Sequence, residues 1–78
     1  MGGKKSRIKN HIRRIRLARS DLTQAELARR IGATRQTVIS IEAQKYAPSL
    51  ELAFRIAYVL ETPIDDVFEF DASDLSAL

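Results

Sequence analysis

Cysteine is absent from the 78-residue chain, and histidine occurs once, as His11. Without cysteine the protein has neither disulfide bonds nor a thiolate nucleophile, and it suits a reducing cytoplasm. A lone histidine favours a surface position over a metal ligand, so we expect no metal site and no cofactor. No apolar run approaches the ~18 residues of a membrane span, and the start MGGKKSRIKN lacks the apolar core of a secretory signal. We therefore expect a cytoplasmic protein with no membrane contact.

The charges are divided unevenly between the two halves of the chain. Residues 1–45 carry 12 Lys and Arg against three acidic residues, whereas residues 46–78 carry one Arg against seven acidic residues. The net charge of +3 therefore conceals a basic half and an acidic half. Such an asymmetry suggests that one face of a single small domain meets a polyanion, although a solvated charged surface is the alternative.

Hydrophobic periodicity and capping residues predict five helices and no strand, hence an all-α fold. Thr23 and Thr34 are N-caps, with Glu26 completing a capping box for the first of these helices, and Gly32 supplies the turn between them. Ser49 is a third N-cap. The predicted helices cover about residues 10–18, 23–32, 34–43, 50–60 and 63–68. Around them we expect a flexible basic arm (1–9), one folded domain (10–70) and an acidic, disordered tail (71–78).

Two short capped helices joined by a tight glycine turn form a helix-turn-helix arrangement. Ala28 is small where the second of these helices crosses the first, and Val38 and Ile41 anchor that helix to the core. With these residues turned inward, Arg35 and Gln36 point outward from its first turn. Arg and Gln each reach two hydrogen-bonding atoms on a guanine or adenine edge, so the pattern predicts a helix end that enters a DNA major groove. The alternative is a solvated helix start.

The stretches LTQAELARRIGATRQTVISIE and YAPSLELAFRIAYVL, within residues 22–60, resemble the Cro and lambda-repressor-type regulators of the Xre family. The resemblance is strongest to small single-domain prokaryotic members. It implies a five-helix, lambda-repressor-like domain that regulates transcription by binding double-stranded DNA as a homodimer on a palindromic operator. One departure is Ala43-Gln44, where family members often have Asn-Gly, which makes the left-handed turn there less favourable.

The resemblance also implies roles for individual residues. Base edges are expected to be read by Arg35, Gln36 and Ser40. Phosphate contacts are expected from Gln24, Thr34, Thr37, Lys45 and Tyr46. Glu42 corresponds to a buried acid that pairs with an arginine of the first helix; Arg16 is the expected partner, with Arg13 and Arg19 left open.

Large apolar side chains in the second half of the chain have two interpretations. They either complete the core or form a homodimer surface composed of Phe54, Tyr58, Val67 and Phe70. Asp65 and Asp66 are expected to offset the dipole of the last helix rather than to catalyse a reaction. An enzyme is not expected, because no nucleophile–base pair, metal cluster or phosphate-binding glycine loop occurs. An alternative function is an antitoxin or adaptor whose acidic tail, residues 69–78, folds onto a protein partner.

Overall fold

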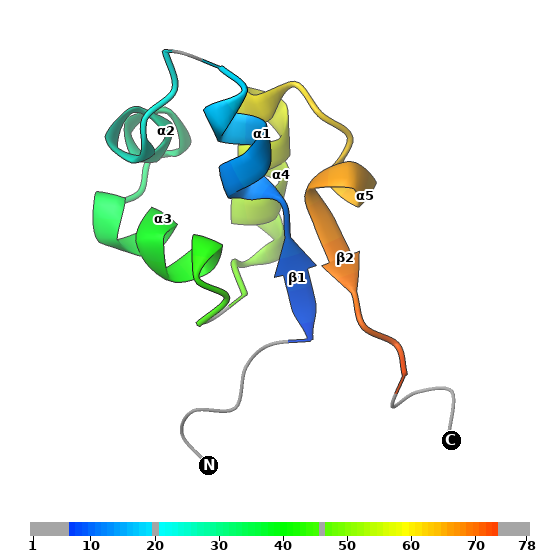
Figure 1. Ribbon diagram of the computed structural model, residues 1–78. Helices are drawn as coiled ribbons and strands as arrows, with labels where there is room; N and C mark the ends of the chain where they lie inside the picture. The colour runs from blue at the N-terminus through cyan, green and yellow to red at the C-terminus, as the bar shows by residue number, and fades with distance from the viewer. Residues whose placement is uncertain (1–6, 20, 46, 74–78) are drawn as a thin grey trace.

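Five helices lie between the two strands of a small ribbon in the described parts of the chain, which are residues 7–19, 21–45 and 47–73 of a computed structural model. In Figure 1, α1 and α4 lie at the centre, α2 and α3 lie on one side, and α5 and the ribbon lie on the other. The elements are β1 (Ile8–Asn10), α1 (Ile12–Leu17), α2 (Gln24–Ile31), α3 (Arg35–Glu42), α4 (Leu50–Leu60), α5 (Ile64–Val67) and β2 (Phe68–Phe70).

Side-chain caps start three of the helices, as the sequence predicts. The hydroxyl oxygens of Thr23, Thr34 and Ser49 each accept a hydrogen bond from a backbone N–H three residues later, at 3.0, 3.1 and 3.2 Å. Gly32, with φ 75°, ends α2 in the left-handed conformation. The predicted capping box is only half formed, because the Glu26 carboxylate binds Arg29 and Arg30 instead of reaching back to the cap.

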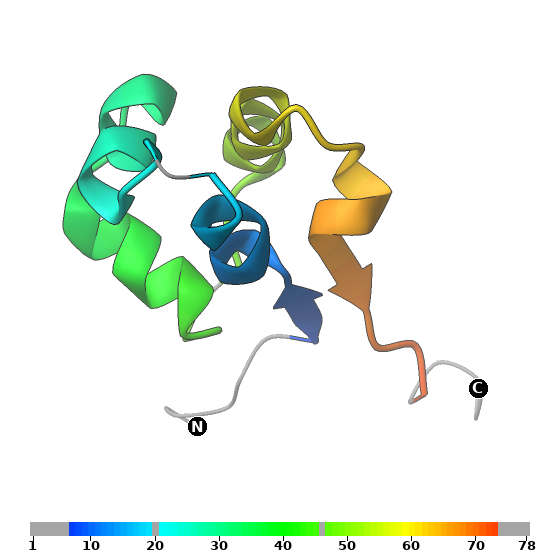
Figure 2. The ribbon, with the colours of Figure 1, turned by 45° about the horizontal axis from the view of Figure 1, so that its top comes forward.

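The core lies where α1, α2, α3 and α4 meet, with one residue from α5. Burying each of its larger side chains contributes about 1.5–3 kcal/mol. Ala28, Val38 and Ile41 are buried as predicted, so α3 packs closely over α2 (Figure 2). The full set of packed residues is Ile12, Leu22, Leu27, Ala28, Ile31, Val38, Ile41, Ile56, Ala57, Leu60 and Val67.

A small antiparallel ribbon corrects the prediction of an all-α fold. β1 pairs with β2 in a register that sets Ile8 opposite Phe70 and Asn10 opposite Phe68. Ile8 and Lys9 were predicted to belong to a flexible arm, but they lie in β1; residues 1–6 of that arm are outside the described residues. The helix predicted from about residue 10 begins at Ile12, because the preceding residues are extended.

The residues predicted to form a dimer surface differ in their exposure to solvent. Val67 is 0% exposed and belongs to the core, so its assignment to a dimer surface is wrong. Phe54, Tyr58 and Phe70 are 54%, 84% and 53% exposed, so they do not complete the core. Of the predicted acidic tail, residues 71–73 are described and exposed, and residues 74–78 are outside the described residues.

Candidate nucleic-acid interface

The first turn of α3 projects polar side chains away from the protein. Arg35 and Gln36 are exposed, and neither makes a side-chain hydrogen bond or ion pair with another described residue. Val38 and Ile41, on the opposite side of the helix, are buried. This division follows from the helical period, which turns residues three apart to the same face. Arg35 and Gln36, two of the three predicted base contacts, are therefore available to a ligand.

Two threonines frame this helix start. Thr34 Oγ1 accepts a hydrogen bond from the backbone N–H of Thr37 and also lies 2.9 Å from Thr37 Oγ1. Ser40, the third predicted base contact, is half-buried one turn later. Lys45 is exposed beyond the end of α3, and its backbone N–H donates to the carbonyl of Ser40 at 3.0 Å. Tyr46 lies outside the described residues.

A buried ion pair joins α3 to α1. Arg16 Nε donates to Glu42 Oε2 at 2.9 Å, and Arg16 Nη2 donates to Oε1 at 3.3 Å. The side chains of Arg16 and Glu42 are 8% and 5% exposed. The predicted pairing with Arg16 is confirmed, whereas Arg19 donates to the carbonyl of Val59 at 3.1 Å. The pair fixes the carboxyl end of α3, and thereby the direction in which its amino end points.

Gln24 participates in the same network. Its Nε2 donates to Glu42 Oε1 at 3.1 Å, so a side chain predicted to contact phosphate also links α2 to α3. The primary amide carries two hydrogens, and one of them remains for a second acceptor. Sequence reasoning did not find this contact, because the two residues are 18 positions apart.

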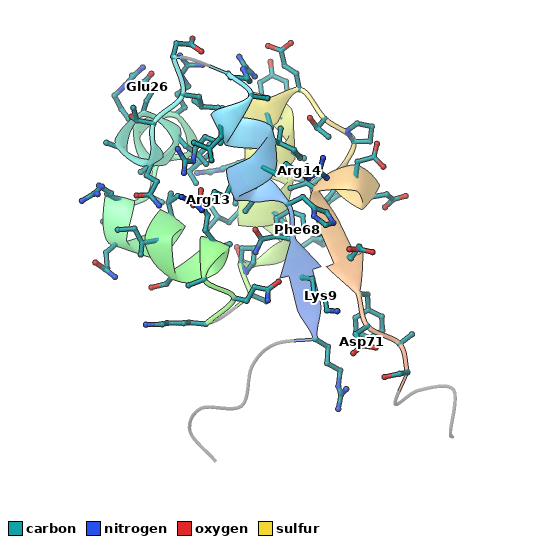
Figure 3. The ribbon with its side chains drawn as sticks, viewed as in Figure 1. Lys9, Arg13, Arg14, Glu26, Phe68 and Asp71 are labelled. Atoms are coloured by element: carbon teal, nitrogen blue, oxygen red, sulfur yellow. The ribbon has the colours of Figure 1, made fainter. Side chains whose placement is uncertain are left out.

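A hollow with a positive lining lies beside this network. It is formed by Arg13, Arg16, Thr23, Gln24, Ala25 and Arg35. Figure 3 shows Arg13 on the side of α1 that faces α2 and α3, whereas Arg14 points toward the ribbon and α5. Glu42 neutralises Arg16, but Arg13 and Arg35 have no ion-pair partner among the described residues. The first amides of α2 add a partial positive charge here, so the hollow favours a phosphate group.

Arg13 is a functional candidate that the sequence analysis did not select. It was considered there as a possible partner of Glu42. The available signal was its position three residues before Arg16, which places the two side chains on the same face of one helix. Whether Arg13 pairs with Glu42 or remains available for a ligand depends on which arginine Glu42 binds, and the sequence alone does not show this.

The other arginines of the basic half are largely neutralised by nearby acids. Hydrogen bonds from Arg29 and then from Arg30 lower the pKa of Glu26 from 4.5 to about 2, so this carboxylate stays charged beside both guanidinium groups. Arg16 pairs with Glu42, and Arg19 Nη2 lies 3.8 Å from Glu61 Oε2. Among the described residues, Lys9, Arg13, Arg14, Arg35 and Lys45 have no ion pair; Lys9 lies on β1, and the other four lie on α1, at the start of α3 and after its end.

The described part of the chain contains neither a metal-binding cluster nor a membrane-spanning helix. Its His, Asp and Glu residues form no group of three that could hold a metal ion. Its helices are all too short or too polar to cross a bilayer.

Comparison with known proteins matches residues 12–67 to a helix-turn-helix family. An uncharacterized HTH-type transcriptional regulator from Archaeoglobus fulgidus is 47% identical over 74% of this chain and 82% of its own length. A protein of the same description from Methanocaldococcus jannaschii is 45% identical over 82% of this chain and 96% of its own. One from Bacillus subtilis is 41% identical over 78% and 91%.

The family match includes the helix pair that carries the outward-facing Arg35 and Gln36. It also includes both members of the ion pair that fixes α3 on α1. The matches to the Archaeoglobus fulgidus and Methanocaldococcus jannaschii proteins cover 82% and 96% of those proteins' own length. The chain therefore belongs to the Xre-type helix-turn-helix family of DNA-binding transcriptional regulators.

Proposed function

We propose that the protein is a sequence-specific transcriptional regulator whose α3 reads base pairs in the major groove. The observation that carries this proposal is the exposed first turn of α3, whose Arg35 and Gln36 have no side-chain partner among the described residues. Arg bidentate to guanine and Gln bidentate to adenine are pairings that discriminate base pairs. Ser40 is half-buried and lies one turn further along α3. Its short side chain would therefore contact a base only at the edge of the same surface.

Phosphate contacts would hold α3 in register on the duplex. Arg13 and the free amide hydrogen of Gln24 border the positive hollow at the start of α2, which suits one phosphate. Thr34 and Thr37 flank the start of α3, and Lys45 follows its end, so they suit phosphates on either side of the groove. Such contacts provide affinity and orientation, whereas the base contacts provide specificity.

The proposed active form is a homodimer on a palindromic operator. Two copies of α3 would enter successive major grooves about 34 Å apart, since this is the repeat of one duplex turn. Leu50, Phe54 and Tyr58 lie four residues apart along α4 and are all exposed, so they form one apolar stripe. Phe70, which lies on β2, is a further exposed apolar side chain. Exposed apolar patches of this kind mark protein–protein contacts.

Selection of bound duplexes from a random pool tests the proposal directly. We expect a short palindromic site, and light scattering should give a complex with two protein copies. If each protomer contacts about five phosphates, log K should fall with log salt at a slope of about −4 to −5 per protomer. Recovery of unrelated sequences after repeated selection would contradict sequence-specific binding.

The apolar stripe of α4 also fits the alternative, an antitoxin or adaptor that docks a second protein. Purification from the native cell distinguishes the two readings, because an antitoxin would carry a stoichiometric partner that is not a second copy. In either case we propose a cytoplasmic binding protein without enzymatic activity.

A further inference from the structure

Gln44 adopts a backbone conformation that disfavours its side chain. It follows α3 with φ 60°, in the left-handed region where glycine is usual at helix ends. Glutamine has a Cβ atom, so it lacks the freedom that glycine has in this region. A non-glycine residue in this conformation carries a cost that must be offset by a contact that glycine cannot make.

The Gln44 side chain makes such a contact with β1. Its Oε1 accepts a hydrogen bond from the backbone N–H of Asn10 at 3.3 Å. Asn10 also donates from its Nδ2 to the carbonyl of Ile41 in the last turn of α3 at 2.7 Å. The Asn10 side chain is itself oriented by the backbone N–H of Ile12, which donates to its Oδ1 at 3.2 Å. The carboxyl end of α3 and the residue that follows it are thus joined to β1 by two hydrogen bonds, both donated by Asn10.

β1 is a firm support for this link. It is paired with β2 through three residues, and the backbone N–H of His11 donates to the carbonyl of Val67 at 2.8 Å. Figure 2 shows the end of α3 and β1 on the same side of the molecule. The end of α3 is therefore bonded to a strand that is itself held by β2 and by the end of α5.

Lys45 is the next residue after this link. Its backbone N–H donates to the carbonyl of Ser40, and its side chain is exposed with no ion pair among the described residues. We propose that Gln44 is a positioning residue for DNA binding: its link to β1 holds Lys45 at the place where the proposed function requires a phosphate contact. The inference rests on that function and adds that β1 supports the DNA-contacting surface.

The test uses Gln44→Gly in the full chain, with Glu61→Gly as its matched control. Glu61 is the C-cap of α4, with φ 53°, and its carboxylate lies 3.8 Å from Arg19 without a link to α3. Both variants remove the cost of a left-handed side chain, so both should raise or maintain Tm. Affinity for the selected operator and for a scrambled duplex is measured by fluorescence anisotropy, at a temperature where each variant is fully folded.

Gln44→Gly should weaken binding to both duplexes by about threefold to eightfold at ~0.1 M salt. The upper limit follows because each phosphate contact raises the affinity by about eightfold when the salt concentration falls tenfold, from ~1 M to ~0.1 M. The salt slope should fall by up to about one. Glu61→Gly should leave both affinities within about twofold, because it removes no phosphate contact. On a Lys45→Ala background, Gln44→Gly should add no further loss, because the residue acts through Lys45.

Three results would overturn the positioning role. They are unchanged affinity of Gln44→Gly, a loss confined to the operator, or an equal loss with and without Lys45. Failure of the wild-type protein to prefer its selected operator would instead overturn the proposed function, so the two ideas fail on different measurements.

Discussion

Breaking the buried Arg16–Glu42 pair should destabilise the fold more than any surface change. In the folded protein, the Glu42 carboxylate accepts hydrogen bonds from Arg16 Nε, Arg16 Nη2 and Gln24 Nε2 at 2.9, 3.3 and 3.1 Å. Arg16→Met removes two of these donors and leaves a charged group in a site that water barely reaches. Removing one partner of a buried pair costs about 3–5 kcal/mol.

This cost is a large share of the stability that a small domain has. Domains have unfolding free energies of about 5–15 kcal/mol, and 1 kcal/mol shifts Tm by about 4–8 °C at this size. We therefore expect Arg16→Met to lower Tm by at least about 12 °C. Urea unfolding followed by circular dichroism gives the free energy, and the urea midpoint should fall without a large change in slope.

Two further variants show whether the lost stability comes from the unpaired buried charge or merely from replacing an arginine. The double variant Arg16→Met/Glu42→Leu replaces both charges with apolar side chains and should recover much of the lost stability. Arg29→Met removes an exposed arginine that also binds a carboxylate, and it should change Tm little. The reasoning would be refuted if Arg16→Met cost less than about 1 kcal/mol, or if the double variant were no more stable than the single one.

Four other predictions test the interface and the core. Arg35→Ala should cost about 1–3 kcal/mol on the operator and less on a scrambled duplex in anisotropy titrations, and equal losses would contradict base reading. Gln24→Ala should weaken both duplexes alike; a loss restricted to the operator would count against its phosphate contact. Val67→Ala should lower the unfolding free energy by about 2 kcal/mol, because two buried methyl groups are lost, and an unchanged urea midpoint would contradict its burial. The folded-state pKa of Glu26, about 2, lies below its ordinary 4.5, so its stabilising effect is present above pH 4.5 and is lost as pH falls toward 2. The Tm advantage of the wild type over Glu26→Gln should therefore shrink across that window, and a constant difference would argue against the pairing.

The sequence predicted the helices whose signals are local. Thr23, Thr34 and Ser49 accept hydrogen bonds from backbone N–H groups three residues later, and Gly32 adopts a left-handed conformation at its own position. Each signal is therefore contained in a few neighbouring residues. The outward turn of Arg35 followed from the helical period alone. These are the features that bring the candidate interface together.

The features that the sequence did not predict depend on distant parts of the chain. β1 and β2 are three residues each and pair the two ends of the chain, so neither has a hairpin turn or a long alternation to identify it. Val67 was misassigned because α5 is a single turn, too short for a period to show which side is buried. The left-handed turn at Gln44 forms without glycine because Asn10, far away in sequence, provides a hydrogen bond.

The tethers of α3 are distributed unevenly along its length. Val38 and Ile41 fix its middle in the core, and its last turn is held both by the Arg16–Glu42 pair and by the bond from Asn10 to the carbonyl of Ile41. Among the described residues, the side-chain hydrogen bonds of its first turn are the local ones between Thr34 and Thr37. Since the described fold does not use the side chains of Arg35 and Gln36, we expect that changing them alters the proposed base contacts of α3 at little cost in stability. A helix held at its end and left free at its start can therefore acquire a new binding preference on an unchanged scaffold.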